Sequence, residues 1–171
     1  AGSWPKAECV GADISAEALA VAEENARLNG LEDRVRFVQT DLFLQDFADR
    51  VGRGFDLVVS NPPYVRPDEW EGLQPEITQY EPREALVAEP DGLAFYRRLA
   101  LLAPELLRSD GVLAVEIGAA QAAEVREIFR ERGLQQIELH WDLAGRDRVV
   151  VARLGAQDAG RERKDEDGGA R

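Results

Sequence analysis

The chain has 171 residues, about the size of one domain, and 44% of them are hydrophobic, which is enough to bury one core. Its 33 acidic residues outnumber the 21 lysines and arginines, and the net charge of −12 disfavours attraction to nucleic-acid phosphates. No apolar run approaches the ~18 residues that cross a bilayer. The single cysteine excludes an internal disulfide and a multi-cysteine zinc site. We therefore expect a cytoplasmic monomer with no membrane partner and no direct nucleic-acid partner.

The chain contains no methionine, not even at residue 1, although translation starts with one. A secretory leader does not explain this, because no charged-then-apolar segment is present. We expect that the start of the protein is missing, through processing or because the chain is the later part of a longer protein.

Strand and helix signals alternate from the beginning of the chain. Residues 8–13 predict a short strand, and Ser15 is suited to cap a helix over residues 16–29, which Gly30 ends. Nearly continuous apolar residues predict three further strands, at residues 35–40, 56–60 and 111–118. Such strands are typical of parallel sheets whose two faces are both covered by helices.

Helices are predicted at residues 92–108, where Pro104 should kink or divide the helix, and at residues 119–132. Strands at residues 136–141 and 148–154 are joined by a link too short for a parallel crossover, so they should pair antiparallel. The fold class is therefore α/β, with an open, mostly parallel sheet that ends in an antiparallel hairpin. Residues 155–171 carry charges and glycines without a large apolar side chain, so a disordered tail is expected there.

A short polar and aromatic segment follows the strand predicted at residues 56–60. It reads Asn61-Pro62-Pro63-Tyr64, and ligands bind at the carboxyl ends of strands in such sheets. The two prolines fix φ near about −65° and hold Asn61 extended. The side-chain oxygen of Asn61 and the carbonyl of Pro62 can then accept both hydrogens of one NH₂ group, while Tyr64 lies against its plane.

This arrangement suits a particular chemistry. An amide or aromatic amino nitrogen is a poor nucleophile because its lone pair is delocalised. Two acceptors favour charge on that nitrogen, and alignment with an electrophilic methyl group supplies the effective concentration of a positioned pair. The segment thus indicates methyl transfer to an NH₂ nitrogen without a metal, a side-chain nucleophile or a general base. As an alternative, the same residues form an ordinary turn or strand exit, in which the tyrosine packs on the core.

Several segments, in order, make the chain resemble a known family. They read Gly11-Ala12-Asp13-Ile14-Ser15, Thr40-Asp41-Leu42-Phe43, Asn61-Pro62-Pro63-Tyr64, Tyr80-Glu81-Pro82-Arg83-Glu84-Ala85-Leu86, Asp91-Gly92-Leu93 and Asp142-Leu143-Ala144-Gly145-Arg146-Asp147-Arg148. Together they resemble the S-adenosylmethionine-dependent glutamine methyltransferases of peptide chain release factors, the HemK or PrmC type. The segment from Glu81 to Leu86 favours this family over adenine methyltransferases.

The resemblance implies a Rossmann-like class I methyltransferase sheet, with residues 1–154 as a partial domain that takes S-adenosylmethionine as cofactor and a release factor as substrate. Asp13 and Ile14 would bind the cofactor, Asp13 through the ribose hydroxyls. Asp41 and Leu42 would flank its adenine. As alternatives, Asp13 is a helix-start charge and the residues at 41 and 42 are a plain strand exit.

The resemblance also assigns the substrate side. The catalytic residues would be Asn61, Pro62 and Tyr64, with Pro63 as a further substrate-binding residue and Asn61 also facing the cofactor. Glu81 and Pro82 would shape the substrate entrance.

Two parts of the family pattern have no counterpart in this chain. These are the Gly-rich cofactor loop, which follows a preceding strand, and the small helical domain before it. The missing first strand would lie between residues 8–13 and 56–60, so its loss leaves two open edges inside the sheet. We expect the isolated chain to bind cofactor weakly and to be marginally stable or prone to aggregate.

Two other functions stay open at this point. An adenine amino methyltransferase on DNA or RNA would use the same four-residue motif, although the acidic composition disfavours it. A non-catalytic fragment of the scaffold would bind a partner without the cofactor loop. Cys9 is interpreted as a small buried hydrophobe, and His140 lacks clustered partners in the sequence, so no metal is expected.

Overall fold

The computed structural model describes residues 2–72, 74, 78–79, 82–88 and 91–155. The strands in this part of the chain are β1 (Cys9–Asp13), β2 (Val35–Gln39), β3 (Phe55–Ser60), β4 (Leu107–Glu116), β5 (Leu134–Trp141) and β6 (Asp147–Leu154). The helices are α1 (Ala16–Leu28), α2 (Phe47–Val51), α4 (Arg83–Leu86), α5 (Ala94–Leu106) and α6 (Ala122–Glu131), with a 3₁₀ helix at Pro67–Gly72. Apart from residue 155, the tail predicted at residues 155–171 lies outside the described residues.

Local chemistry explains where the predicted elements begin and end. Ser15 caps α1, because its Oγ accepts a hydrogen bond from the backbone N–H of Ala18 at 3.1 Å. Gly30 follows the end of α1 with a φ of 62°, a conformation that favours glycine. α5 does not divide at Pro104 and ends at Leu106.

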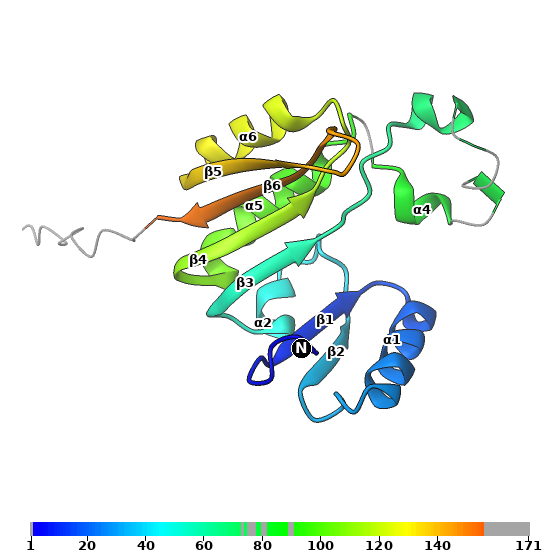
Figure 1. Cartoon of the computed structure of the whole chain (residues 1–171), viewed down its shortest axis with the longest axis vertical. Coiled ribbons are helices and arrows are strands. Elements are labelled where there is room, and N and C mark those ends of the chain that lie inside the picture. Colours follow the sequence, from blue (N-terminus) through cyan, green and yellow to red (C-terminus); the bar gives the residue numbers. More distant parts are fainter. Residues whose placement is uncertain (1, 73, 75–77, 80–81, 89–90, 156–171) are drawn as a thin grey trace, which may run out of the picture.

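The strands form two separate sheets (Figure 1). β1 and β2 pair in parallel. The second sheet has the order β3-β4-β6-β5, with β3 parallel to β4 and with β6 antiparallel to both of its neighbours. The predicted α/β class and the antiparallel hairpin of β5 and β6 are therefore confirmed, since β6 alone runs against the other described strands of its sheet.

The two sheets are separate because β1 and β3 are not hydrogen-bonded to each other. Figure 1 shows their arrowheads pointing toward the same end of the molecule. Val10 of β1 and Val58 of β3 pack against the same apolar cluster, so the two strands face a common interior. Each strand thus has one unpaired edge, as expected for a sheet that lacks a strand at this position.

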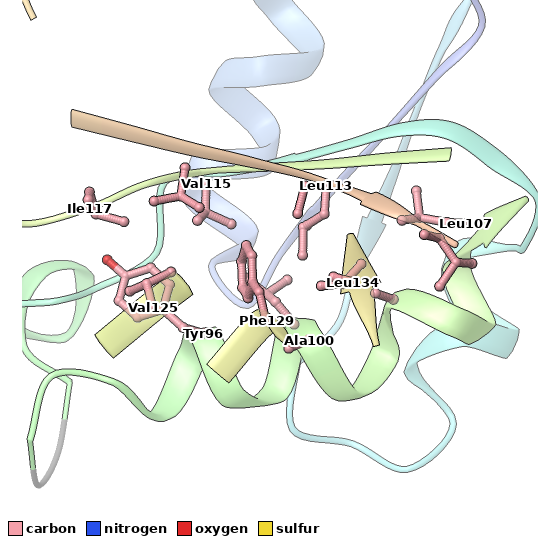
Figure 2. Close-up of a cluster of buried hydrophobic side chains, with 14 of the residues drawn as sticks. Tyr96, Ala100, Leu107, Leu113, Val115, Ile117, Val125, Phe129 and Leu134 are labelled. Atoms are coloured by element: carbon pink, nitrogen blue, oxygen red, sulfur yellow. The ribbon is translucent and has the colours of Figure 1, made fainter. Parts of the chain in front are cut away.

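The main core lies on one face of the second sheet, beneath α5 and α6 (Figure 2). Tyr96 and Phe129 are the largest of its fully buried side chains. Val115 and Ile117, at the carboxyl end of β4, pack into the same cluster. This packing fixes the end of β4 next to the start of α6.

The opposite face of this sheet is less buried than the sequence predicts. The apolar strands suggested burial on both faces, but from Gly111 to Glu116 β4 alternates buried residues with half-buried ones. Val59 of β3 is 71% exposed. The prediction is wrong here because α5 and α6, the helices in contact with β4, β5 and β6, cover one face only.

A smaller cluster joins the two sheets. Phe47 and Val51 of α2 pack against Leu102 and Leu106 of α5, with Val10 at the margin. Packing, rather than a hydrogen-bonded ladder, therefore connects β1 and β2 to the rest of the molecule. Among the helices of the described residues, none has the length and apolar character needed to cross a membrane.

Candidate functional site

The motif from Asn61 to Tyr64 begins where β3 ends. Asn61 is exposed, and its side chain makes no hydrogen bond to the described residues, whereas Pro62 is buried. Asn61 borders a hollow of about 300 Å³. The other residues that line it are Val59, Ser60, Ala114, Val115, Glu116 and Val149. The amide of Asn61 is thus anchored by a buried proline and remains available to a ligand.

Tyr64 is held through its backbone. Its N–H donates to the carbonyl of Leu86 at 3.0 Å, and the N–H of Val65 donates to the same carbonyl at 2.8 Å. Val65 then forms a parallel bridge with Val87. The chain just after α4 therefore supports the motif, which brings Pro82, at the start of α4, into the same part of the molecule.

The phenol of Tyr64 lies between two opposite charges. Its hydroxyl is 3.5 Å from Glu116 Oε1 and 3.5 Å from an Arg148 guanidinium nitrogen. Arg148 also lies 3.4 Å from Glu116 and 3.7 Å from Asp142. Backbone N–H groups of Arg146 and Ala144 hold the pKa of Asp142 below its usual value, so this carboxylate is ionised at neutral pH.

The predicted cofactor residues lie at the ends of β1 and β2. The carboxylate of Asp13 accepts from the N–H of Ser15 at 2.8 Å, and the carbonyl of Asp13 accepts from the N–H of Thr40 at 2.9 Å. This second bond joins the two strand ends. Ile14 is exposed beside them, and its carbonyl accepts from Gln39 Nε2 at 3.1 Å.

The loop after β2 is fixed from two directions. Asp41 accepts from the N–H of Phe43 at 2.8 Å, which forms a local turn. Arg98 of α5 donates from Nε to the carbonyl of Leu42 at 2.8 Å, and a second guanidinium nitrogen donates to the carbonyl of Leu44. Leu42 packs against both apolar clusters. The position of this loop therefore depends on α5.

The structure brings together the four residues that were predicted to bind the cofactor. Asp13, Ile14, Asp41 and Leu42 share the edge where β1 and β2 end. Glu81, the other residue assigned to the substrate entrance, lies outside the described residues.

The sequence analysis assigned no role to four residues that support the site, although one of them, Arg148, ends a segment that carries the resemblance. They are Arg98, Glu116, Gln121 and Arg148. Glu116 carries one usable signal, a carboxylate that ends an apolar strand. The contacts by which the other three support the site are with residues distant in the chain.

The remaining polar candidates play no part in this site. Cys9 is a half-buried free thiol, and His140 is exposed with its Nε2 3.6 Å from Glu138. In the part of the chain that the structure describes, no group of three His, Cys, Asp or Glu side chains is placed to hold a metal ion.

The class of protein follows from the match of this chain to known proteins. The family model described as a methyltransferase domain matches residues 2–146, and the chain belongs to that family. A methyltransferase from Pyrococcus furiosus has the same fold, with a TM-score of 0.62 and 16% identity over 86% of this chain and 63% of that one. The predicted Rossmann-like class I methyltransferase fold is thus confirmed.

Closer relatives in sequence confirm the resemblance seen in the motifs. The release factor glutamine methyltransferase of Chlorobaculum tepidum is 52% identical over 125 residues, 73% of this chain and 42% of the relative. That of Clostridium acetobutylicum is 43% identical over 145 residues, 85% of this chain and 50% of the relative. The chain spans about half the length of the curated relatives it matches.

Proposed function

We propose that the protein transfers a methyl group from S-adenosylmethionine to the side-chain amide nitrogen of a glutamine in a peptide chain release factor, in the cytoplasm. The observation that carries this proposal is the exposed Asn61 amide and its rigid Pro62-Pro63-Tyr64 neighbours at the carboxyl end of β3. The names of the relatives support the choice of substrate. Residues 1–154 form the methyltransferase domain, in part.

The residues at the ends of β1 and β2 fit the nucleoside part of S-adenosylmethionine. Asp13 uses one carboxylate oxygen for Ser15 and has an exposed carboxylate left to accept from ribose hydroxyls. Asp41 likewise uses one oxygen in its turn, and Leu42 supplies apolar contact for the adenine, with Ile14 beside it. When bound, the cofactor supplies an electrophilic methyl group.

The chain's own residues act on the glutamine amide. The side-chain oxygen of Asn61 and the carbonyl of Pro62 accept its two N–H groups, which favours electron density on the amide nitrogen. The ring of Tyr64 lies against the amide plane and, with Pro63, fixes its direction. Because Asn61 is exposed, the proton that leaves after transfer passes to solvent, so the proposed mechanism needs no general base.

The test is transfer of labelled methyl from S-adenosylmethionine to a release factor, by the natural polypeptide that contains this chain. Label should enter the release factor and should be absent when its target glutamine is replaced by alanine. DNA and RNA serve as competing acceptors, because the same motif suits adenine amino groups. Label in adenine, or equal label in the alanine-substituted release factor, would overturn the proposal.

A further inference from the structure

The side chain of Gln121 joins three segments around Tyr64. Its Nε2 donates to the carbonyl of Tyr64 at 3.2 Å and to that of Gly92 at 3.3 Å. Its Oε1 accepts from the N–H of Gly118 at 2.9 Å and lies 3.3 Å from the hydroxyl of Tyr96, whose single proton also has the carbonyl of Glu116 as an acceptor at 3.0 Å. Gln121 is thus the one described side chain that touches the motif, the turn before α5 and the turn before α6 together.

The hydrogen-bonding capacity of this amide is largely used. A carboxamide has two N–H donors and an oxygen with two lone pairs. Both donors and one lone pair have partners of their own here, and the second lone pair shares the proton of Tyr96 with the carbonyl of Glu116. The orientation is set because the N–H of Gly118 can only donate and both partners of Nε2 are carbonyls, which can only accept. Burial raises the pKa of the Tyr96 hydroxyl, so it remains a donor at neutral pH.

The other end of Tyr64 is held by charge. Its hydroxyl sits between Glu116 and Arg148, which also contact each other and are both partly buried. Arg148 reaches the carbonyl of Ile117 at 3.4 Å as well, so its guanidinium is tied to the end of β4. These contacts, at 3.4 to 3.5 Å, are longer than those of Gln121.

We propose that Gln121, Glu116 and Arg148 are positioning residues that hold Tyr64 from both ends, through its carbonyl and its hydroxyl, in the direction that the substrate amide requires. This inference rests on the proposed function, because it assigns these residues to the substrate side of the same site. They act through Tyr64 and do not touch the reacting atoms. The cofactor residues at the ends of β1 and β2 have other hydrogen-bond partners, so we expect changes at Gln121, Glu116 or Arg148 to leave cofactor binding unchanged.

The first test reads the tyrosine directly, without catalysis. In chain labelled with ¹³C in its tyrosine rings, Gln121→Glu keeps the acceptor oxygen but loses both donors to the carbonyls, and it should shift and broaden the Tyr64 ring signals. Gln136→Glu makes the same chemical change at an exposed position of β5 and should leave those signals unchanged. Unchanged Tyr64 signals in a folded Gln121→Glu chain would overturn the inference.

The second test separates positioning from general stability. Arg148→Lys keeps the charge but loses the planar fork, and it should raise KM for a glutamine peptide roughly tenfold while the Kd of the cofactor stays constant. In a Tyr64→Phe background the same substitution should have no further effect, because the hydroxyl through which it acts is gone.

Additive effects of Arg148→Lys and Tyr64→Phe, or an equal loss of cofactor affinity, would refute positioning through Tyr64. If Gln121→Glu does not fold, this cycle still decides whether Tyr64 is held through its hydroxyl. A wild-type protein that transfers no methyl group would instead contradict the proposed function, and the ring signals would still decide the role of Gln121.

Discussion

Asn61 carries the proposed chemistry with almost no part in the fold. Its side chain is exposed and bonds to none of the described residues, so Asn61→Ala should change the free energy of unfolding by less than about 0.5 kcal/mol. Loss of one acceptor at the reacting amide should lower the rate of methyl transfer on the order of a hundredfold or more. Asn25→Ala, at an exposed position of α1, is the matched control for both measurements. Retained activity in Asn61→Ala would remove this residue from the mechanism.

Gly92 tests the support of Tyr64 from a second side. A Cβ at Gly92 would lie 2.6 Å from the carbonyl oxygen of Tyr64 and 2.9 Å from Gln121 Nε2, and its φ is 75°. Gly133 has a φ of 78° with nothing within 4 Å, so Gly133→Ala carries the backbone strain alone. That strain costs about 1–2 kcal/mol in either variant.

Gly92→Ala should therefore lose more stability than Gly133→Ala in urea unfolding, and it alone should weaken binding of a glutamine peptide. Equal losses of stability with intact peptide binding in both variants would show that the Tyr64 carbonyl can move at little cost.

At this scale the sequence reveals residues whose role depends on their neighbours in the chain. Asn61 and Tyr64 stand out because two prolines and a strand end are adjacent to them. Gln121 and Arg148 do not stand out, because Tyr64, which both contact, lies 57 and 84 positions away from them in the chain. A role can be assigned to such residues only when the topology is known, because it places β6 beside β4 and the motif beside α6.

Among the elements, α5 connects the core to the cofactor side of the site. Arg98 donates from Nε and from a terminal nitrogen to two carbonyls of the loop after β2, and the single nitrogen of a lysine ammonium group does not match this planar pair of donors. Arg98→Lys should weaken S-adenosylmethionine binding roughly fivefold, the equivalent of about one hydrogen bond, and leave peptide binding unchanged. Titration calorimetry measures both.

Arg130→Lys is the appropriate control, since Arg130 pairs with Glu127 on the exposed face of α6. If both variants bind cofactor alike, the loop keeps its shape without α5, and Leu42 packing alone must hold it.

The elements themselves were largely predictable, because caps, glycines and apolar runs mark their ends. Ser15 and Gly30 bound α1 as expected. The failure was the second face of the sheet: the apolar run in β3 predicted burial, yet Val59 is exposed. Composition along a strand reports what could be buried, whereas the helices available in the structure decide what is buried.

On the scale of the whole molecule, the two sheets are coupled by limited packing. Val10, Leu42 and the α2 side chains make apolar contact between them, and α1 buries only Leu19 and Ala26 among its own residues. The part built from β1, α1 and β2 should therefore open at lower free energy than the core beneath α5 and α6, which hydrogen exchange would detect.

The unpaired edges of β1 and β3 lead to a last prediction, that the 171-residue chain associates as its concentration rises. Val59→Lys places a charge on the exposed edge strand β3 and should reduce association in light scattering, with little loss of stability since Val59 is 71% exposed. Leu101→Lys removes an exposed apolar residue from a helix, α5, and not from an edge strand, so it should leave association unchanged. Equal reduction by both would indicate general hydrophobic attraction. A cooperative, high-temperature melt of the monomer would show that packing across the divided sheet suffices without a strand between β1 and β3.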